Sequence, residues 1–530
     1  MKEGLIYVGT DDGLIQVTQD GGKSWMKYEK FTGVGENYYV ARIIASRFDA
    51  NTVYAAFDGH KYADFKPYLF KSNDAGKSWT SISNNLPDNG YVHGIAEDIV
   101  DSNLIFCGTE FGAWYSNDGG AKWQKLGTGL PTIAVHDMLV HPREGDLVIA
   151  TFGHSFYVLD DISPLRWMKP DNMKVEAAVL PVRDTLMYIE TSPLGGRGKA
   201  FNGESYYEAD NPPYGATITY FLKDKYKSLK EKRQDAERAA ARDNGGSAYP
   251  KLKYPSAEEL RAEAEQEAPS VWLTISDAQG NIVRRLPAQN NQGINRVTWN
   301  LRQPAVTVPQ GPPPTGAAAE LEALFGGGNN GILTIPGEYT VRLSKKVDGG
   351  WSDLGTPQKF NVVTEGQDKA DPTAIKELHD FLAKVAKLNR AVSGAASFAG
   401  EMKAHLDVLR RALRETPSDT NALIARADAL EKQLVAVQLV MNGDNVARQR
   451  QDPEKTSLTG RVGSILGDHR TSLQPPTTNG KHDYAIAAEL FIAVLPELRQ
   501  VADGVAQLEK DAEKAGAPWS PGRFPEWTDK

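Results

Sequence analysis

Short segments with alternating apolar and polar residues fill the first third of the chain, and this pattern predicts β-strands. The segments recur in the same order, separated by turns rich in Gly, Asp and Asn. They cover residues 39–44, 52–56, 68–71 and 79–82, then 91–97, 104–108, 113–116 and 123–126, and then 133–140, 147–151 and 156–159. An opening copy starts at residues 5–9, which match the second strand of the later copies. The pattern therefore predicts a repeat of small four-stranded sheets whose first copy lacks its innermost strand.

One turn motif recurs within these copies: Ser or Thr, Asp two residues later, Gly two residues after that, and Trp three residues further on. Its copies begin at Thr18, Ser72 and Ser116, which are 54 and 44 residues apart. In such a turn the aspartate accepts hydrogen bonds from backbone N–H groups, the glycine adopts a positive φ, and the tryptophan packs over the hairpin. We therefore assign a structural role to Asp20, Trp25, Asp74, Trp79, Asp118 and Trp123.

This turn resembles the Asp-box of BNR-repeat β-propellers. Residues 108–112, 141–147 and 150–161 also resemble the last blades of bacterial sortilin-like BNR proteins, which are often labelled glycosyl hydrolases. The resemblance implies that residues 1–170 form a partial propeller of about four blades, the C-terminal part of a larger one. It also implies a secreted or periplasmic intact protein, with the missing N-terminal half of the propeller or another chain as its partner. Where this family carries an arginine, the chain has His154, so a site that uses the arginine is not carried over.

The middle of the chain predicts a second all-β unit. Residues 171–210 read as a connector, and residues 211–365 show the alternation and turn spacing of an Ig-like β-sandwich. Two insertions interrupt this unit: residues 225–268 are charged and favour helices, and residues 306–330 are rich in Pro, Gly and Ala and predict a loop. The unit resembles the small Ig-like domains near the C-termini of secreted bacterial proteins.

Apolar residues change to helical spacing in the last third of the chain. Ile375, Leu378, Leu382 and Val385 follow one helix face, and later stretches repeat this pattern. Residues 366–516 therefore predict a helical bundle, followed by a Pro/Trp-rich tail over residues 517–530 that we expect to lie on the surface as a strap. The predicted fold class is multidomain, mainly β plus α: a partial BNR-type β-propeller, an Ig-like β-sandwich and a C-terminal helical bundle.

Composition excludes several functions. The 530 residues carry a formal net charge of −8, so a nucleic-acid partner is not expected. Cys107 is the single cysteine, which excludes a disulfide within the chain. No stretch is apolar enough to span a membrane, and the chain does not open on a signal peptide. The sequence lacks the motifs of zinc sites, phosphate loops and serine hydrolases, so we expect no metal and no cofactor.

The candidate functional residues lie in turns that are predicted to share one rim of the propeller. Loops that join successive blades, and loops that join the second and third strands of a blade, emerge on the same face around the axis. In this register we expect five basic or imidazole side chains to form a ligand-binding set: Arg42, His60, His93, His136 and His154. The rim also holds the carboxylates Asp58, Glu110 and Asp137 and the aromatic residues Tyr38, Tyr39, Tyr62, Tyr91 and Trp114.

Three interpretations of this rim remain open. Polar loops with aromatic rings favour a surface that binds a protein or a glycan, without catalysis by this chain in isolation. A glycoside hydrolase would instead use paired carboxylates, for which Asp58, Glu110 and Asp137 are the candidates. The rim residues would otherwise be turn formers without a ligand. Separately, the incomplete first sheet predicts that the chain self-associates or binds a polypeptide that supplies the missing strand.

Overall fold

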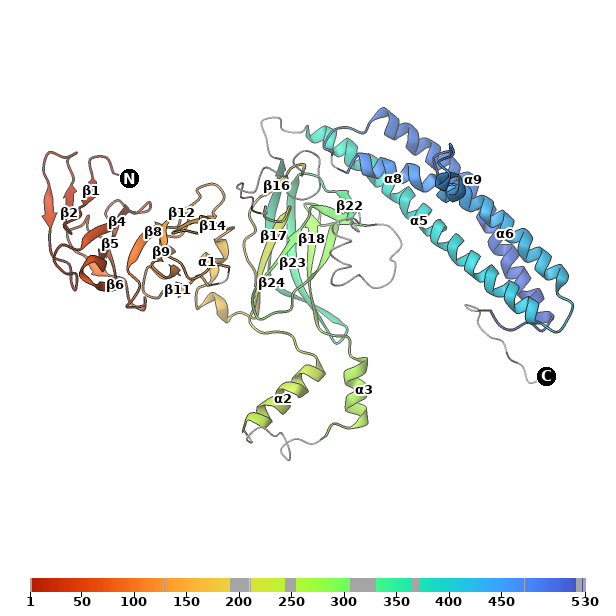
Figure 1. Cartoon of the computed structure of the whole chain (residues 1–530), viewed down its shortest axis with the longest axis horizontal. Coiled ribbons are helices and arrows are strands. Elements are labelled where there is room, and N and C mark those ends of the chain that lie inside the picture. Colours follow the sequence, from red (N-terminus) through yellow and green to blue (C-terminus); the bar gives the residue numbers. More distant parts are fainter. Residues whose placement is uncertain are drawn as a thin grey trace.

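The computed structural model describes residues 2–127, 129–190, 209, 211–243, 254–305, 330–364, 371–470, 472–520 and 527. The molecule is elongated, with small sheets at the N-terminal end, a β-sandwich in the middle and long helices at the other end (Figure 1). Sheets thus dominate the first two parts and helices the last, in agreement with the predicted combination of β and α parts.

Four small antiparallel sheets follow one another along the N-terminal part of the chain. The first contains β1 (Ile6–Gly9), β2 (Ile15–Thr18) and β3 (Met26–Tyr28). The second contains β4 (Tyr39–Ala45), β5 (Val53–Gly59), β6 (Asp64–Ser72) and β7 (Thr80–Ser81). The third contains β8 (Val92–Glu97), β9 (Ile105–Thr109), β10 (Gly112–Ser116) and β11 (Gln124–Lys125). The fourth contains β12 (Val135–Val140), β13 (Leu147–Thr151) and β14 (Phe156–Leu159). The strands of each sheet pair in chain order, which is the meander of a propeller blade.

Each pair of neighbouring sheets encloses a core of its own. The first and second sheets enclose Ile15, Val17, Phe57 and Phe70, and the second and third enclose Tyr54, Leu69, Ile105, Cys107 and Trp123. The third and fourth enclose Phe106, Ala113, Val135, Met138 and Ile149. Glycine permits the close approach of the third and fourth sheets, since a Cβ on Gly108 would lie 2.4 Å from the Val135 carbonyl oxygen. The sheets therefore stack in series as the blades of a propeller do.

Strand β1 forms the free edge of the first sheet, because β2 is its only partner among the described strands. The repeated turn begins at the end of β2, as it does at the ends of β6 and β10. This register makes β1 equivalent to β5 and β9, the second strands of their sheets. Ile6 and Val8 point away from the core, with 45% and 39% of their surfaces exposed.

The middle unit is a β-sandwich of two main sheets. One has the order β15-β17-β20 and the other the order β16-β24-β23-β18-β19, with β21 and β22 as a separate pair. The strands are β15 (Ala177–Val179), β16 (Thr185–Met187), β17 (Ala216–Leu222), β18 (Ser270–Asp277), β19 (Ile282–Ala288), β20 (Gly293–Trp299), β21 (Arg302–Pro304), β22 (Asn330–Leu333), β23 (Gly337–Val347) and β24 (Gly350–Thr364). The core between the main sheets includes Tyr220, Leu273, Trp299 and Val341.

The prediction of a simple connector over residues 171–210 is wrong in part. Strand β15 pairs with β17, and β16 runs parallel to β24, so two short pieces of this region complete the sandwich. Each piece is three residues long, too short to show alternation. Helix α1 (Ser163–Trp167) lies just before this region, and the single turn η2 (Asn172–Lys174) lies within it.

The charged insertion forms two helices, α2 (Leu229–Asp243) and α3 (Ala257–Glu265), which project from the sandwich (Figure 1). Arg233 of α2 joins them through an ion pair with Glu263 of α3. The predicted loop at residues 306–330 lies outside the described residues except for Asn330, which begins β22.

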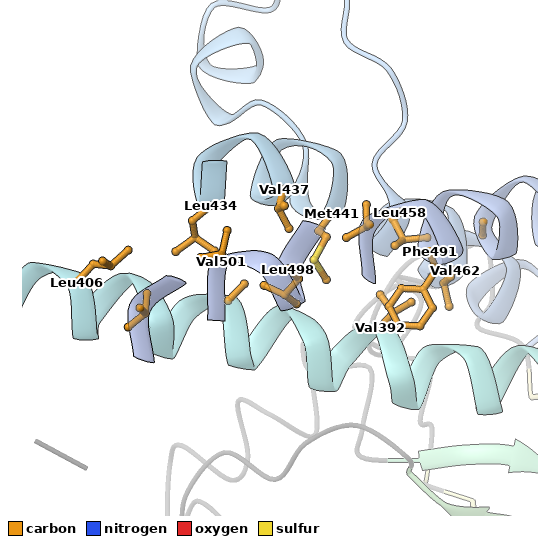
Figure 2. Packing of buried hydrophobic residues seen from close by; sticks show 14 of the residues in the cluster. Val392, Leu406, Leu434, Val437, Met441, Leu458, Val462, Phe491, Leu498 and Val501 are labelled. Atoms are coloured by element: carbon orange, nitrogen blue, oxygen red, sulfur yellow. The ribbon is translucent and has the colours of Figure 1, made fainter. Parts of the chain in front are cut away.

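The C-terminal unit is built from α5 (Pro372–Glu415), α6 (Asn421–Asn442), α7 (Asn445–Gln449), α8 (Leu458–Asp468) and α9 (Thr478–Lys514). Figure 2 shows side chains from four of these helices meeting in one core, among them Val392, Leu434, Val462 and Phe491. The predicted tail starts on this unit, where the Ser520 hydroxyl donates to Glu509 Oε1 at 3.1 Å. Of the remainder of the tail only residue 527 is described.

Candidate functional site

The aspartates of the three repeated turns are bound within their own turns. Asp74 Oδ1 accepts from the Ser78 backbone N–H and the Ser72 hydroxyl, both at 2.8 Å, and Oδ2 accepts from the Ser78 hydroxyl at 2.6 Å. Hydrogen bonds from Ser78 lower the pKa of Asp74 to about 2. Asp20 and Asp118 accept the equivalent backbone hydrogen bonds at 3.0 and 2.9 Å. These contacts support a structural role for the motif and leave little of its carboxylates for a ligand.

The tryptophan of each motif is directed at the sheet that precedes its own. Its burial therefore depends on whether the structure describes a sheet there. Trp123 is 2% exposed, and its indole Nε1–H donates to the Ile82 carbonyl of the second sheet at 2.7 Å. Trp79 lies with its ring 5.8 Å from that of Phe31, in the core between the first and second sheets. Trp25 belongs to the first sheet and remains 43% exposed.

A continuous row of rings crosses the rim from the second sheet to the fourth. His60 stacks on Tyr91 with ring centroids 5.2 Å apart, Tyr91 meets His93 at 4.7 Å, and His93 stacks on His136 at 4.4 Å. Tyr39 extends the row at one end through His60, and Phe152 extends it at the other end through His136. The structure thus brings three of the predicted imidazoles into one row.

Glycine in β8 permits this stacking. A Cβ on Gly94 would lie 3.2 Å from both the His136 carbonyl oxygen and Asp137 Cα. A larger residue at this position would press on the backbone of β12 at His136, the residue whose ring stacks on His93. The row is therefore set by how closely the inner strands pack.

The three candidate carboxylates occupy different environments. The Asp58 side chain is fully enclosed, and it accepts from the Tyr39 hydroxyl and from the backbone N–H of His60. The Asp58 carboxylate also lies 2.8 Å from His60 Nδ1. Asp137 forms an ion pair with Arg42 at 2.7 Å. These two carboxylates therefore orient neighbouring side chains.

Glu110 is the candidate carboxylate that lies against the row of rings. Its side chain is 33% exposed and lies 2.9 Å from His93 Nε2. Burial, together with a hydrogen bond to Glu110, raises the pKa of Tyr91 to about 12. Burial also holds the pKa of His93 below its ordinary value, and the adjacent His136 imidazole acts in the same direction. The row thus contains one partly exposed carboxylate, which lies against His93 and Tyr91.

Exposed phenylalanines lie near this row, in or beside the connection between the second and third strands of three successive sheets. Phe65 is the second residue of β6, Phe111 lies in the turn between β9 and β10, and Phe152 lies in the turn between β13 and β14, with 49%, 44% and 71% of their surfaces exposed. Tyr62, in the turn η1 (His60–Tyr62), adds a fourth ring and is 56% exposed. The sequence interpretation did not select the three phenylalanines. Their signal is an exposed apolar residue in or beside a turn, where polar residues are expected.

Two predicted rim residues lie apart from the row. His154 is exposed in the turn between β13 and β14. Trp114 packs against the core between the second and third sheets, because its position in β10 directs the ring between them.

Within the described residues, no group of three or more His, Cys, Asp or Glu side chains is arranged to hold a metal ion. No helix in the described part of the chain is long and apolar enough to cross a membrane.

No protein-family model matches the chain, and no curated protein matches it. Among solved structures, YCF48 bound to D1 peptide is 16% identical with a TM-score of 0.24, over 30% of this chain and 48% of that chain. The GH74 enzyme of Niastella koreensis is 15% identical with a TM-score of 0.25, over 67% of this chain and 47% of that chain. The GH74 xyloglucanase from Xanthomonas campestris is 14% identical with a TM-score of 0.25, over 66% and 43% respectively. The chain thus spans less than half of each structure, and these values are too low to transfer a site, a ligand or a reaction.

Proposed function

We propose that the N-terminal sheets form an extracytoplasmic binding module whose rim recognises a protein or a glycan without hydrolysing it. The observation that carries this proposal is the set of exposed rings of Phe65, Phe111 and Phe152, which lie in or beside the connection between the second and third strands of three sheets. Exposed apolar rings gathered at one place mark interaction surfaces, and aromatic residues dominate binding energies at such surfaces. A location outside the cytoplasm follows the sortilin-like resemblance.

The arrangement beneath these rings supports binding because it is already ordered. Stacking of His93 on His136 and the hydrogen bonds of Asp58 hold the turns in place. A surface that is ordered before binding loses less conformational entropy when the ligand arrives. Phenylalanine carries no polar group, so its rings suit apolar side chains of a protein or the flat faces of sugar rings.

The glycoside hydrolase alternative has less support. Hydrolysis needs two carboxylates that flank the glycosidic bond, one protonated and one ionised. Asp58 is enclosed and bound by Tyr39 and His60, and Asp137 is paired with Arg42. Glu110 therefore has no free carboxylate partner within the candidate set.

Phe111→Ala and Phe152→Ala should each weaken ligand binding about 10-fold or more, because exposed aromatic anchors carry much of the binding free energy. Ligands would be sought with a displayed-peptide library and a glycan array and then titrated by calorimetry. Phe48→Ala is the matched control: Phe48 is 44% exposed, like Phe111, but lies in the turn between β4 and β5 at the opposite ends of the strands.

Equal loss of binding in Phe48→Ala would refute the assignment to this rim. A glycan that is cleaved by the chain and spared by Glu110→Gln would instead support the hydrolase alternative. Both outcomes are separable from unfolding, since substitutions of exposed residues usually change stability by about 0.5 kcal/mol or less.

We also propose that a further β-sheet covers the open side of the first sheet, supplied by another part of the intact polypeptide or by a partner chain. Ile6, Val8, Trp25 and Met26 are between 39% and 45% exposed on this sheet. The equivalent Trp79 and Trp123 pack against the sheet that precedes them. By this equivalence, Trp25 is placed to pack against another sheet.

The isolated chain should self-associate through this surface, because exposed apolar residues beside a free strand edge favour pairing. The double variant Ile6→Lys with Val8→Lys should reduce the apparent mass measured by light scattering toward that of a monomer. Ile282→Lys, at a 53% exposed position on the sandwich, should leave it unchanged. A monomeric parent chain, or an equal effect of both changes, would contradict this proposal.

A further inference from the structure

A cavity of about 350 Å³ lies between the sandwich and the helical unit, apart from the propeller rim. Its apolar walls come from both units: Ile332 and Leu333 of β22, Ile375, Leu378 and Leu382 of α5, and Leu466 of α8. Binding sites for small molecules are usually mostly apolar, with a few polar groups that fix the orientation of the ligand, and they favour boundaries between units. The volume and the walls of this cavity fit that description.

Positive charge gathers at one side of the cavity. Arg302 lines it from β21, and Arg470 lines it from the segment after α8. The Arg302 guanidinium donates to the Arg470 carbonyl at 2.8 Å and to the Gly331 carbonyl at 3.5 Å. Burial lowers the pKa of Arg302, and the charge of Arg470 acts in the same direction. Two like charges are therefore held near each other at the edge of an apolar space.

Neither guanidinium forms an ion pair with a carboxylate within the described part of the chain. Glu190 acts on Arg302 only as a more distant charge. A partly buried cation without a counter-ion is costly, and guanidinium matches a carboxylate through two parallel hydrogen bonds. Among the other polar side chains of the cavity, Gln303 and His379 lie 3.3 Å apart, and burial holds the pKa of His379 below its ordinary value.

We propose that this cavity binds a small amphipathic carboxylate, with its apolar part between α5, α8 and β22 and its carboxylate on Arg302 and Arg470. Charge complementarity selects this class, because the apolar walls accept a hydrocarbon chain and only the guanidinium side offers a charged partner. The site is independent of the function proposed for the propeller rim.

Three probes with the same hydrocarbon chain test this assignment on the full chain: dodecanoate, dodecanol and dodecyltrimethylammonium. Titration calorimetry below the micelle concentrations should show saturable dodecanoate binding at one site, about 10-fold or more tighter than dodecanol, since a hydrogen bond to a charged group contributes this much. The ammonium probe should bind most weakly. Arg470→Gln should weaken dodecanoate about 10-fold and leave dodecanol unchanged.

Two glycines of α8 permit a test of where in the molecule dodecanoate binds. Gly463 and Gly467 line the cavity, and a Cβ built on either meets no atom within 4 Å. Gly463→Phe should therefore fill the space without a clash and should weaken dodecanoate about 10-fold or more. Gly400→Phe is the matched control, since Gly400 lies on α5 away from the cavity and also has open space around it. Both changes favour the helix, so loss of binding would not reflect unfolding.

Equal affinity for the three probes, or full affinity in Gly463→Phe, would overturn the proposal. A variant in which a short Gly/Ser linker replaces residues 306–329 tests a second possible occupant, because Ala305 and Gly331 on either side of this segment of the sequence line the cavity. If dodecanoate bound only to this variant, the cavity would be a site for the chain's own segment and the proposal would be wrong. Binding to both forms with the same preference for the carboxylate supports it.

Discussion

Trp123→Ala should lower the free energy of unfolding of the propeller by about 3–5 kcal/mol, the usual loss for a fully buried tryptophan. Trp123 is 2% exposed and belongs to the core between the second and third sheets. Its indole Nε1–H donates to Ile82, and its backbone N–H donates to Asn85 Oδ1 at 2.8 Å. The change would therefore leave both a cavity and an unpaired carbonyl group between two sheets.

Trp25→Ala is the matched control, because Trp25 occupies the same place in the same turn but is 43% exposed. Its Nε1–H donates to Gly22 within its own turn at 3.2 Å. Urea unfolding followed by far-UV circular dichroism should show a loss several times smaller than that of Trp123→Ala. Equal losses would mean that the tryptophan stabilises only its own hairpin, and that burial between sheets adds nothing.

This pair of residues also shows what the sequence could and could not predict. Alternation, the spacing of the turns and the apolar helix stripes located most strands and helices, since these signals are local. Trp25 and Trp123 are indistinguishable in the motif, and their burial differs because only Trp123 has a described sheet before it. Local patterns do not contain that information.

The candidate site was predictable to a similar degree. The register of the strands placed His60, His93 and His136 on one rim, and the structure brings their rings into one row. The closeness of His93 and His136 depends on Gly94, whose significance appears only when two sheets are packed together. Phe65, Phe111 and Phe152 were missed because single apolar residues in or beside turns carry no periodic signal.

The sandwich shows the same limit for long-range pairing. Strand β16 pairs with β24, although the two strands are far apart in the sequence. Just before β16, Asp184 Oδ1 accepts a hydrogen bond from the backbone N–H of Asn361, a residue 177 positions later. A strand of three residues has no independent stability, and its partner determines whether it forms. From the sequence alone, such short strands therefore look like connectors between longer elements.

Arg166→Met should destabilise the propeller by about 3–5 kcal/mol at neutral pH, because it removes the partner of a buried carboxylate. Asp98 is 0% exposed, and the Arg166 guanidinium donates to its two oxygens at 2.7 and 2.8 Å. Burial alone would raise the pKa of Asp98, but the hydrogen bonds from Arg166 and from backbone N–H groups hold it below the ordinary value. The native pair therefore favours the ionised carboxylate, and the variant would favour the protonated one.

The loss in Arg166→Met should depend on pH in a defined direction. In the parent chain the folded pKa of Asp98 lies below the unfolded value of about 3.9, so its contribution is present above that pH and is lost as pH falls through the folded pKa. In the variant the unpaired carboxylate must be protonated or buried as a charge, so stability falls as pH rises above the unfolded pKa. The difference between the two chains should thus be largest at neutral pH and should shrink toward about pH 4.

Urea unfolding of both chains between about pH 4 and pH 7 measures this difference. Arg143→Met is the control, because Arg143 is 77% exposed in its ion pair with Glu144 and such surface pairs contribute about 1 kcal/mol or less. Its effect should be small at every pH. A loss in Arg166→Met that stayed constant with pH would mean that the side chain of Arg166 stabilises the propeller by packing, because only the charge of Asp98 links stability to pH at this position.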